Sequence, residues 1–221
     1  KTSEGVIFIY SKYIYSGIVP LALALEYNGY QNYKKQLLDM DKNDPVLIKD
    51  DQGKNHEAKY IIISGTQELG RNAYDDYLKA ENQNKNGEKI KIILGTETAA
   101  EGLDFKNIRE IHILDPWHHL NKLEQIIGRG IRFCSHSMLE KSKHNVTVFI
   151  HTAVYGNNET IDHYNYRLGE RKSIEIGEIE MILKRNALDC YLFKEGNVIK
   201  KSDVTPIKML NSKGKTNIIE V

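Results

Sequence analysis

The sequence has few of the residues that cross-link or interrupt a chain. Its 221 residues include two cysteines, Cys134 and Cys190, four prolines and one tryptophan. Two cysteines cannot build the multi-bridge framework of small secreted domains, so we expect reduced thiols. No apolar run approaches the roughly 20 residues that a membrane-spanning helix needs, and no signal peptide is visible. These absences argue against a disulfide scaffold and a membrane protein.

A dominant charge is also missing. Lysine and arginine total 31 against 30 acidic residues, for a net charge of +1. This balance neither indicates nor excludes a nucleic-acid partner, because a local basic groove can be hidden in a neutral total. The length suits one α/β domain of about 150 residues with an appendage. Because the first residue is Lys1, we expect the chain to be part of a longer protein.

Short apolar runs alternate with helical stretches over most of the chain. Strands are predicted at residues 6–10, 60–64, 90–94, 110–114 and 146–152, helices at 17–28 and 69–80, and polar loops at 42–59 and 81–89. A further helix is predicted from Asn121, which would form its N-cap with Glu124. Strands spaced by helices predict right-handed βαβ units and a parallel sheet, hence an α/β fold.

The pattern changes after about Val154. Residues 160–185 predict a charged helix, broken near Gly169 and Gly177, and the tail shows weak periodicity that fits short strands or an ordered coil. We therefore predict two parts, a lobe at 1–154 and a helical extension with a tail at 155–221.

Two polar loops follow predicted strands. The first, GTETAAEGLDF, offers the Thr96 hydroxyl, close backbone approach at Gly102 and the Asp104 carboxylate. The second, DPWHHLN at 115–121, leads into EQIIGRGIR at 124–132. In parallel sheets, ligands bind at the carboxyl ends of strands. We therefore predict a site for a phosphate, a ribose and a nucleic-acid backbone at this edge.

Gln125, Arg129 and Arg132 are spaced to share one face of a helix. A stripe that faces the core should be apolar, whereas planar guanidiniums suit phosphate oxygens. A solvated helix face is the alternative for an isolated glutamine and arginine pair. The neighbouring polar loops favour a phosphate site.

GTETAAEGLDF followed by QIIGRGIR resembles motifs V and VI of superfamily two helicases and ATPases, and VIFIYSKY resembles their motif IV. The resemblance covers about Gly5–Thr152 and implies the second RecA-like lobe of such a protein. ILDPWHHLNKLEQIIGRGIRFCSH and the stretch 161–190 are similar to the branch in nucleocytoplasmic large DNA viruses. That branch includes the poxvirus early transcription factor small subunit, the related nucleoside triphosphatase and African swine fever virus counterparts.

The resemblance implies a role for each matched residue. Arg129 and Arg132 would be arginine fingers for the γ-phosphate of ATP, and Gln125 would help to place that phosphate or the attacking water. Asp104 would contact the ribose or couple to motif VI, with Gly102 beside the nucleotide. Ser11 and Thr96 would contact the nucleic-acid backbone. The glycines at 128 and 130 would allow close packing on the sheet.

Part of an ATP site is missing from the sequence. Gly214, Lys215 and Thr216 imitate the end of a P-loop, but Met209 occupies the first glycine position. No Asp-Glu pair follows a strand, as an Mg²⁺ site would require. We therefore expect ATP and Mg²⁺ to be bound mainly by an N-terminal lobe outside this chain, and we expect this chain alone to be inactive.

Two functions fit the resemblance. The first is a helicase or translocase driven by ATP, acting on DNA rather than RNA. The alternative is a transcription initiation or termination factor that uses its ATPase as a switch, with viral RNA polymerase or transcription factor subunits as partners. A catalytically dead scaffold is disfavoured by the intact Gln125, Arg129 and Arg132. The resemblance implies the host cytoplasm, in viral factories, and the virion.

The remaining conspicuous residues have plainer interpretations. His118, His119, Cys134 and His136 fit no standard zinc spacing, so no metal site is predicted. Trp117 would either stack on a base or anchor the following helix. The apolar side of the stretch 174–185 should pack on the lobe or on a partner, and Cys190 should be buried.

Overall fold

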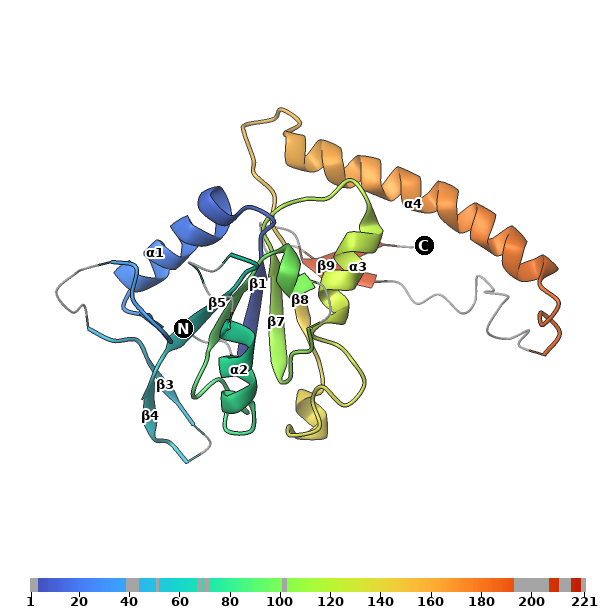
Figure 1. The fold of residues 1–221 in the computed structure, drawn as a ribbon. Helices are drawn as coiled ribbons and strands as arrows, with labels where there is room; N and C mark the ends of the chain where they lie inside the picture. Colours follow the sequence, from blue (N-terminus) through green and yellow to red (C-terminus); the bar gives the residue numbers. More distant parts are fainter. Residues whose placement is uncertain are drawn as a thin grey trace. The chain divides into compact units, whose positions relative to one another are not determined.

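The computed structural model has a parallel β-sheet at its centre (Figure 1). It describes residues 4–38, 44–50, 52–66, 69, 72–100 and 103–192, and the strands at 207–210 and 216–219. The sheet strands are β1 (Val6–Tyr10), β2 (Gln31–Asn32), β5 (Lys59–Ile63), β6 (Ile92–Gly95), β7 (Ile108–Ile113) and β8 (Thr147–Ile150). Their order is β2-β5-β6-β1-β7-β8, and every neighbouring pair is parallel. The predicted α/β, RecA-like sheet is confirmed.

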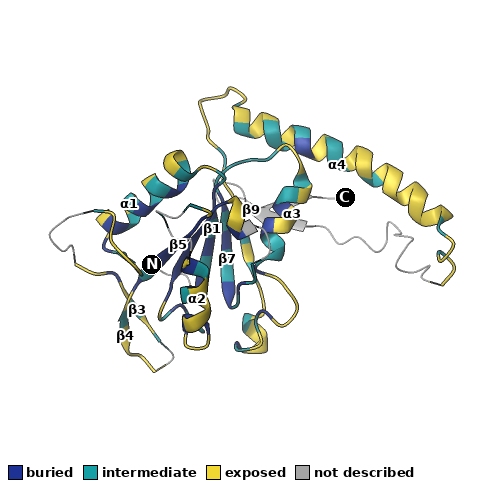
Figure 2. Ribbon diagram, in the orientation of Figure 1, coloured by how far each residue is buried: buried dark blue, intermediate teal, exposed yellow. Residues whose placement is uncertain are grey.

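Helices cover both faces of this sheet. One face carries α1 (Val19–Tyr27), preceded by a π-helical turn at Ile14–Ile18, and the other carries α2 (Ala73–Glu81) and α3 (Leu120–Gly128). Side chains alternate along a strand, so Tyr60 and Ile62 of β5 pack under α1 while Ile61 and Ile63 join the core under α2 and α3. The buried strands between these layers are dark blue in Figure 2.

The strand order creates a switch point at β1. The chain leaves β1 through α1 on one face and leaves β7 through α3 on the opposite face, although β1 and β7 are neighbours. Connections that diverge in this way open a crevice at the carboxyl ends of the two strands. The loops at 11–13 and 114–119 lie at the carboxyl ends of β1 and β7.

Some local predictions are wrong. The stretch 42–59 contains an antiparallel pair, β3 (Leu47–Lys49) and β4 (Asn55–Glu57), rather than only a loop. The N-cap of α3 is His119, and no side chain caps this helix. Asn121 therefore lies inside the first turn, and the predicted capping box with Glu124 does not form.

A long helix, α4 (Ile161–Asn186), runs without a break through both glycines at which breaks were predicted. Glycine in a helix interior costs about 1 kcal/mol relative to alanine, and the Glu, Lys, Arg, Ile and Leu residues around Gly177 outweigh that cost. Beyond α4, Cys190 lies half-exposed in a turn, so its predicted burial is wrong. The last strands, β9 (Ile207–Leu210) and β10 (Thr216–Ile219), pair antiparallel.

The chain divides into two compact units, Lys1–Gly169 and Glu170–Val221. The boundary between a lobe and an extension near Val154 stays a prediction. The apolar residues of the second half of α4 are 42–65% exposed, among them Ile176, Ile179 and Leu183. None of the described helices is long and apolar enough to cross a membrane.

Candidate functional site

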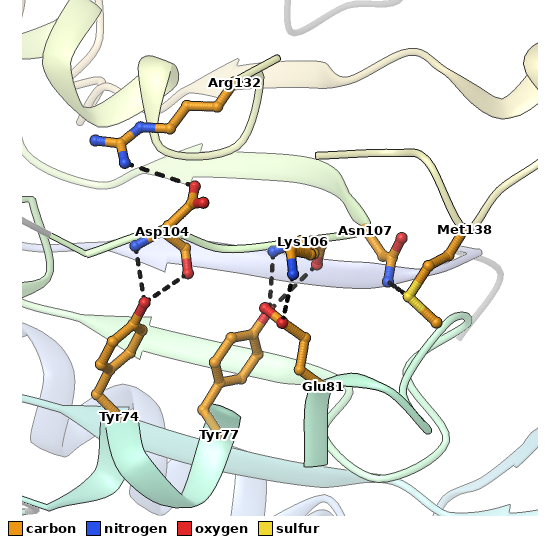
Figure 3. A network of polar contacts seen from close by, with 8 residues as sticks. All are labelled: Tyr74, Tyr77, Glu81, Asp104, Lys106, Asn107, Arg132 and Met138. Atoms are coloured by element: carbon orange, nitrogen blue, oxygen red, sulfur yellow. Dashed lines mark hydrogen bonds and ion pairs between the residues drawn. The ribbon is translucent and has the colours of Figure 1, made fainter. Parts of the chain in front are cut away.

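The connection from β6 to β7 passes alongside α2, and two tyrosines of α2 hold its main chain. The Tyr74 hydroxyl donates to the Asp104 carbonyl oxygen (3.0 Å) and accepts from the Asp104 amide (3.1 Å). The Tyr77 hydroxyl makes the same pair of bonds to Lys106, at 3.3 and 3.0 Å. Phe105, between them, is fully buried. Asp104 is thus presented from a fixed backbone (Figure 3).

An ion pair reinforces this attachment. Lys106 Nζ lies 2.8 Å from Glu81 Oε2 at the end of α2. This hydrogen bond, with the negative charge of Glu81, raises the pKa of Lys106 above its ordinary value. Burial raises the pKa of the Tyr77 phenol, which keeps the hydroxyl protonated as a donor. Residues 104–106 are therefore tied to α2 by two tyrosine hydroxyls and one ion pair.

Two arginines approach the same segment from the other side. Arg129 Nη1 donates to the Leu103 carbonyl oxygen at 3.2 Å. Arg132 Nη1 lies 3.6 Å from Asp104 Oδ1, and the two side chains are 42% and 49% exposed. An ion pair this exposed contributes little stability. The 3.6 Å contact is longer than a hydrogen bond, and Asp104 Oδ1, although buried, accepts no hydrogen bond from the described residues.

The arginines do not share one helical stripe with Gln125, which corrects the sequence prediction. Helix α3 ends at Gly128, so Gln125 lies on the helix, exposed, while Arg129 is its C-cap and Arg132 lies in the following turn. The prediction that glycine allows close packing on the sheet is confirmed at Gly130, where a Cβ would lie only 2.9 Å from the Ile111 side chain. The same prediction is wrong at Gly128, where a Cβ would meet nothing within 4 Å.

The arginines also lie away from the carboxyl edge of the sheet, where they were expected. Helix α3 begins just after β7 ends and carries the chain back along the sheet, by about 13 Å for nine residues. After it, the carbonyl oxygen of Ser135 accepts from the amide of Asn107, directly before β7, at 2.9 Å. The predicted single site is therefore two sites, an arginine pair beside α2 and a loop cluster at the carboxyl edge.

The loop cluster at the carboxyl edge is basic and aromatic. Lys12 Nζ lies 4.6 Å from the ring centroid of Tyr13 and 4.7 Å from that of Trp117, within the range of cation–π contacts. The Lys12 amide donates to Asp115 Oδ2 at 2.9 Å, and the Trp117 ring stacks on His118. We call these five residues the Lys12 cluster. Lys12 was not among the residues predicted from the sequence, although it directly follows Ser11, which was predicted to contact the nucleic-acid backbone.

The two hydroxyls predicted to contact nucleic acid are buried. Ser11 is 0% and Thr96 is 3% exposed. Ser11 Oγ donates to the Tyr13 carbonyl oxygen (3.2 Å) and accepts from the Tyr13 amide (3.1 Å), and a Cβ at Gly17 would collide with it. Contact of either hydroxyl with a phosphate would require its loop to open, so this role stays a prediction. Gly102 lies outside the described residues.

The described residues provide no group of three His, Cys, Asp or Glu side chains that could hold a metal ion. The guanidiniums of Arg129 and Arg132 fit the phosphates of a nucleotide by charge and geometry.

Comparison with known proteins agrees with this architecture. The family model of the helicase conserved C-terminal domain matches residues 38–134. The chain is 34% identical over 203 residues to an Acanthamoeba polyphaga mimivirus protein named as an ATP-dependent RNA helicase, R563, an alignment that covers 90% of this chain and 32% of the relative. It is 30% identical over 220 residues to the termination factor NPH-I homolog of African swine fever virus, covering 86% of this chain and 31% of the relative.

The chain spans only 19–32% of the length of the curated relatives it matches first. Among solved structures, the C-terminal part of the Fun30 ATPase domain aligns with a TM-score of 0.40 and 11% identity, over 79% of this chain and 48% of that one. That likeness is too distant to bear on the site. Residues 38–134 therefore match the helicase C-terminal domain, and the chain is similar to helicase-like and NPH-I-like proteins of large DNA viruses.

Proposed function

We propose that this lobe completes an ATP site whose other half lies on a second lobe, and that Arg132 and Arg129 are its arginine fingers. The observation that carries the proposal is the exposed, weakly held pair of Arg132 and Asp104, at 3.6 Å. A phosphoryl-transfer transition state spreads negative charge over its oxygens, and preorganised guanidiniums stabilise that charge. Asp104 would then be the resting partner that Arg132 leaves when the γ-phosphate arrives.

The two arginines would have different tasks. Arg129 donates to the Leu103 carbonyl oxygen and sits at the C-cap of α3, so it ties motif VI to motif V as well as offering charge. Arg132 lies beyond the helix and is free to move toward a phosphate. Gln125 is exposed on α3 and is proposed to help orient the γ-phosphate or the attacking water, with Gly102 beside the nucleotide.

Nucleic acid is proposed to bind at the carboxyl edge, over the Lys12 cluster. The ammonium group of Lys12 can contact a phosphate, and the exposed rings of Tyr13 and His118 offer stacking surfaces. Ser11 and Thr96 would join the contact if their loops open on closure of the two lobes. DNA is our first expectation for the nucleic acid, and closure around ATP would move one lobe along it.

The test is nucleic-acid-dependent ATP hydrolysis by the complete polypeptide that carries this lobe. Arg132→Ala should lower kcat by about 10³-fold or more, as expected for an arginine finger, with ATP binding largely retained. Arg167→Ala is the matched control, because Arg167 is an exposed arginine paired with Glu159 at 2.8 Å. Unchanged turnover in Arg132→Ala would refute the proposal.

A second candidate is an ATPase switch in transcription. It is favoured by the similarity to a relative named as a termination factor, at 30% identity over 220 residues. In this role the complete protein would hydrolyse ATP on DNA while it acts on RNA polymerase or transcription factor subunits. A strand-displacement assay separates the two functions: a helicase displaces the strand, whereas a switch hydrolyses ATP and displaces nothing.

A further inference from the structure

The turn that carries Arg132 has an unusual backbone. The Ser135 amide donates to the Arg132 carbonyl oxygen at 3.0 Å, so Phe133 and Cys134 form the centre of a tight turn. Cys134 has a φ of +61°, in the left-handed region, which is uncommon for residues other than glycine, asparagine and aspartate. Phe133, beside it, is 97% exposed. Such a conformation persists only where its surroundings hold it.

Ser135 and His136 supply that hold. Ser135 is 4% exposed, and its Oγ donates to the Gly130 carbonyl oxygen (3.3 Å) and lies 2.9 Å from His136 Nδ1. His136 Nε2 lies 2.7 Å from the carbonyl oxygen of Ile108, the first residue of β7. The Ser135 carbonyl oxygen accepts from Asn107. We call the two side chains and these bonds the Ser135–His136 latch.

The partners define the hydrogens in this latch. A carbonyl oxygen can only accept, so His136 Nε2 must carry a hydrogen. In the neutral ring Nδ1 then carries no hydrogen, so Nδ1 and the Gly130 carbonyl oxygen are alternative acceptors for the single hydroxyl hydrogen of Ser135. The latch thereby connects the turn after α3 to the first residue of a central strand through one buried hydroxyl and one oriented imidazole.

We propose that the Ser135–His136 latch is the positioning element for the Arg132 guanidinium. This inference rests on the proposed function of Arg132 as a finger. Among the described residues, the Arg132 side chain is held only by the 3.6 Å contact with Asp104, so its direction depends on the main chain that bears it. Preorganised charge is effective only when second-layer contacts fix its support. The latch fixes that main chain on both sides of Arg132, at Gly130 and at Ser135.

The complete polypeptide tests this inference through steady-state ATP hydrolysis in Ser135→Ala, His136→Ala and His136→Gln. His56→Ala is the matched control, because the half-buried His56 in β4 also makes a hydrogen bond through Nε2, to Asp50 Oδ2 at 2.8 Å, away from the latch. We expect His136→Ala to lower kcat about 10- to 100-fold, the scale expected when a reacting group is misplaced by about 1 Å. KM for ATP should stay close to wild type.

Two further readings separate positioning from general stability. A glutamine amide can also donate to the Ile108 carbonyl oxygen, so His136→Gln should restore most of the lost kcat. In the Arg132→Ala background, His136→Ala should cause little additional loss, because the latch acts through the arginine that is already gone. Ser135→Ala provides the same comparison with less change in packing if His136→Ala does not fold.

The outcomes distinguish the two proposals. If Arg132→Ala abolishes turnover but the latch variants behave like His56→Ala, the latch inference fails and the proposed role of Arg132 stands. Equal and independent losses in His136→Ala with and without Arg132 would also overturn the latch inference. If Arg132→Ala leaves turnover unchanged, the proposed function fails, and the latch has no finger to position.

Discussion

Tyr74 and Asp104 are joined by two hydrogen bonds through one hydroxyl, which donates to the Asp104 carbonyl oxygen at 3.0 Å and accepts from its amide at 3.1 Å. The Asp104 carboxylate meanwhile faces Arg132. One residue of the β6–β7 connection is therefore held from below by α2 and contacted from above by the motif VI turn (Figure 3). Helix α2 therefore fixes the position of the resting partner of the proposed arginine finger.

Tyr74→Phe should destabilise the chain by about 1–2 kcal/mol, because one hydroxyl serves both a donor and an acceptor of the partly buried Asp104 main chain. Urea denaturation would measure the change in the free energy of unfolding. Tyr15→Phe is the control, since Tyr15 is 71% exposed and should change stability by less than about 0.5 kcal/mol. Equal effects in the two variants would show that the bonds to Asp104 contribute nothing.

Lys12→Ala should weaken nucleic-acid binding and should reduce the slope of log affinity against log salt by about one, as expected for loss of a single phosphate contact. Ser11→Ala should instead lower stability with little change in affinity, because the Ser11 hydroxyl is buried and bonded to Tyr13. Fluorescence anisotropy with a labelled oligonucleotide over a salt series would measure both. A larger affinity loss in Ser11→Ala would restore the contact predicted from sequence.

The buried strands could be predicted from sequence because continuous runs such as VIFIY and YIIIS have few alternatives in a folded domain. The β3–β4 hairpin could not, because each strand is only three residues long and β4, NHE at Asn55–Glu57, is entirely polar. Its pairing is set by the turn and by neighbouring main chain rather than by a hydrophobic pattern. Short, exposed elements of this kind carry almost no signal in a single sequence.

The sequence could predict that the two arginines and Asp104 lie together, but not the geometry in which they do so. The motif pattern indicated Arg129, Arg132 and Asp104, and the structure brings all three to one segment. Spacing alone placed the arginines on one helix, and that failed because α3 ends before the second glycine. Ser135 and His136 could not be found in the sequence, since their partners are main-chain atoms of β7 and the turn after α3.

Glu26 is a buried carboxylate that joins three segments of the lobe. It accepts hydrogen bonds from the Tyr60 hydroxyl (2.7 Å) and from the amides of Leu37 (2.9 Å) and Leu38 (2.7 Å). Burial, followed by the bond to Glu26, raises the pKa of Tyr60, so the phenol remains a donor at any ordinary pH. This carboxylate attaches residues 37–38 to α1 and β5.

Glu26→Ala should destabilise the lobe by about 3 kcal/mol or more, because it leaves three donors without an acceptor. Glu26→Gln should cost less, since its amide oxygen still accepts. Thermal and urea unfolding would rank the variants against Glu124→Ala, a change on the exposed side of α3. If Glu26→Ala proved as stable as Glu124→Ala, the carboxylate would not be what holds residues 37–38.

Lys91 is a buried cation at the amino end of β6. It is 6% exposed, and its Nζ donates to the Gly5 carbonyl oxygen at 2.6 Å. Burial lowers its pKa to about 8, against an opposing effect of the Glu110, Glu4 and Glu88 charges. The folded state therefore releases the Lys91 proton at a lower pH than the unfolded chain does.

The stability of the lobe should consequently rise with pH through the Lys91 window. Between the folded pKa of about 8 and the unfolded value, ordinarily about 10.4, the unfolded chain binds more protons, so the free energy of unfolding increases with pH. Below pH 8 the cost of burying the charge is present in full. Lys91→Met removes the titrating amine. The free energy of unfolding of wild type, measured relative to that of Lys91→Met, should therefore increase from pH 7 to pH 10 by an amount on the order of 2–3 kcal/mol. Urea unfolding of both proteins at each pH cancels the titration of other groups, and a pH-independent difference would show that Lys91 keeps an ordinary pKa in the fold.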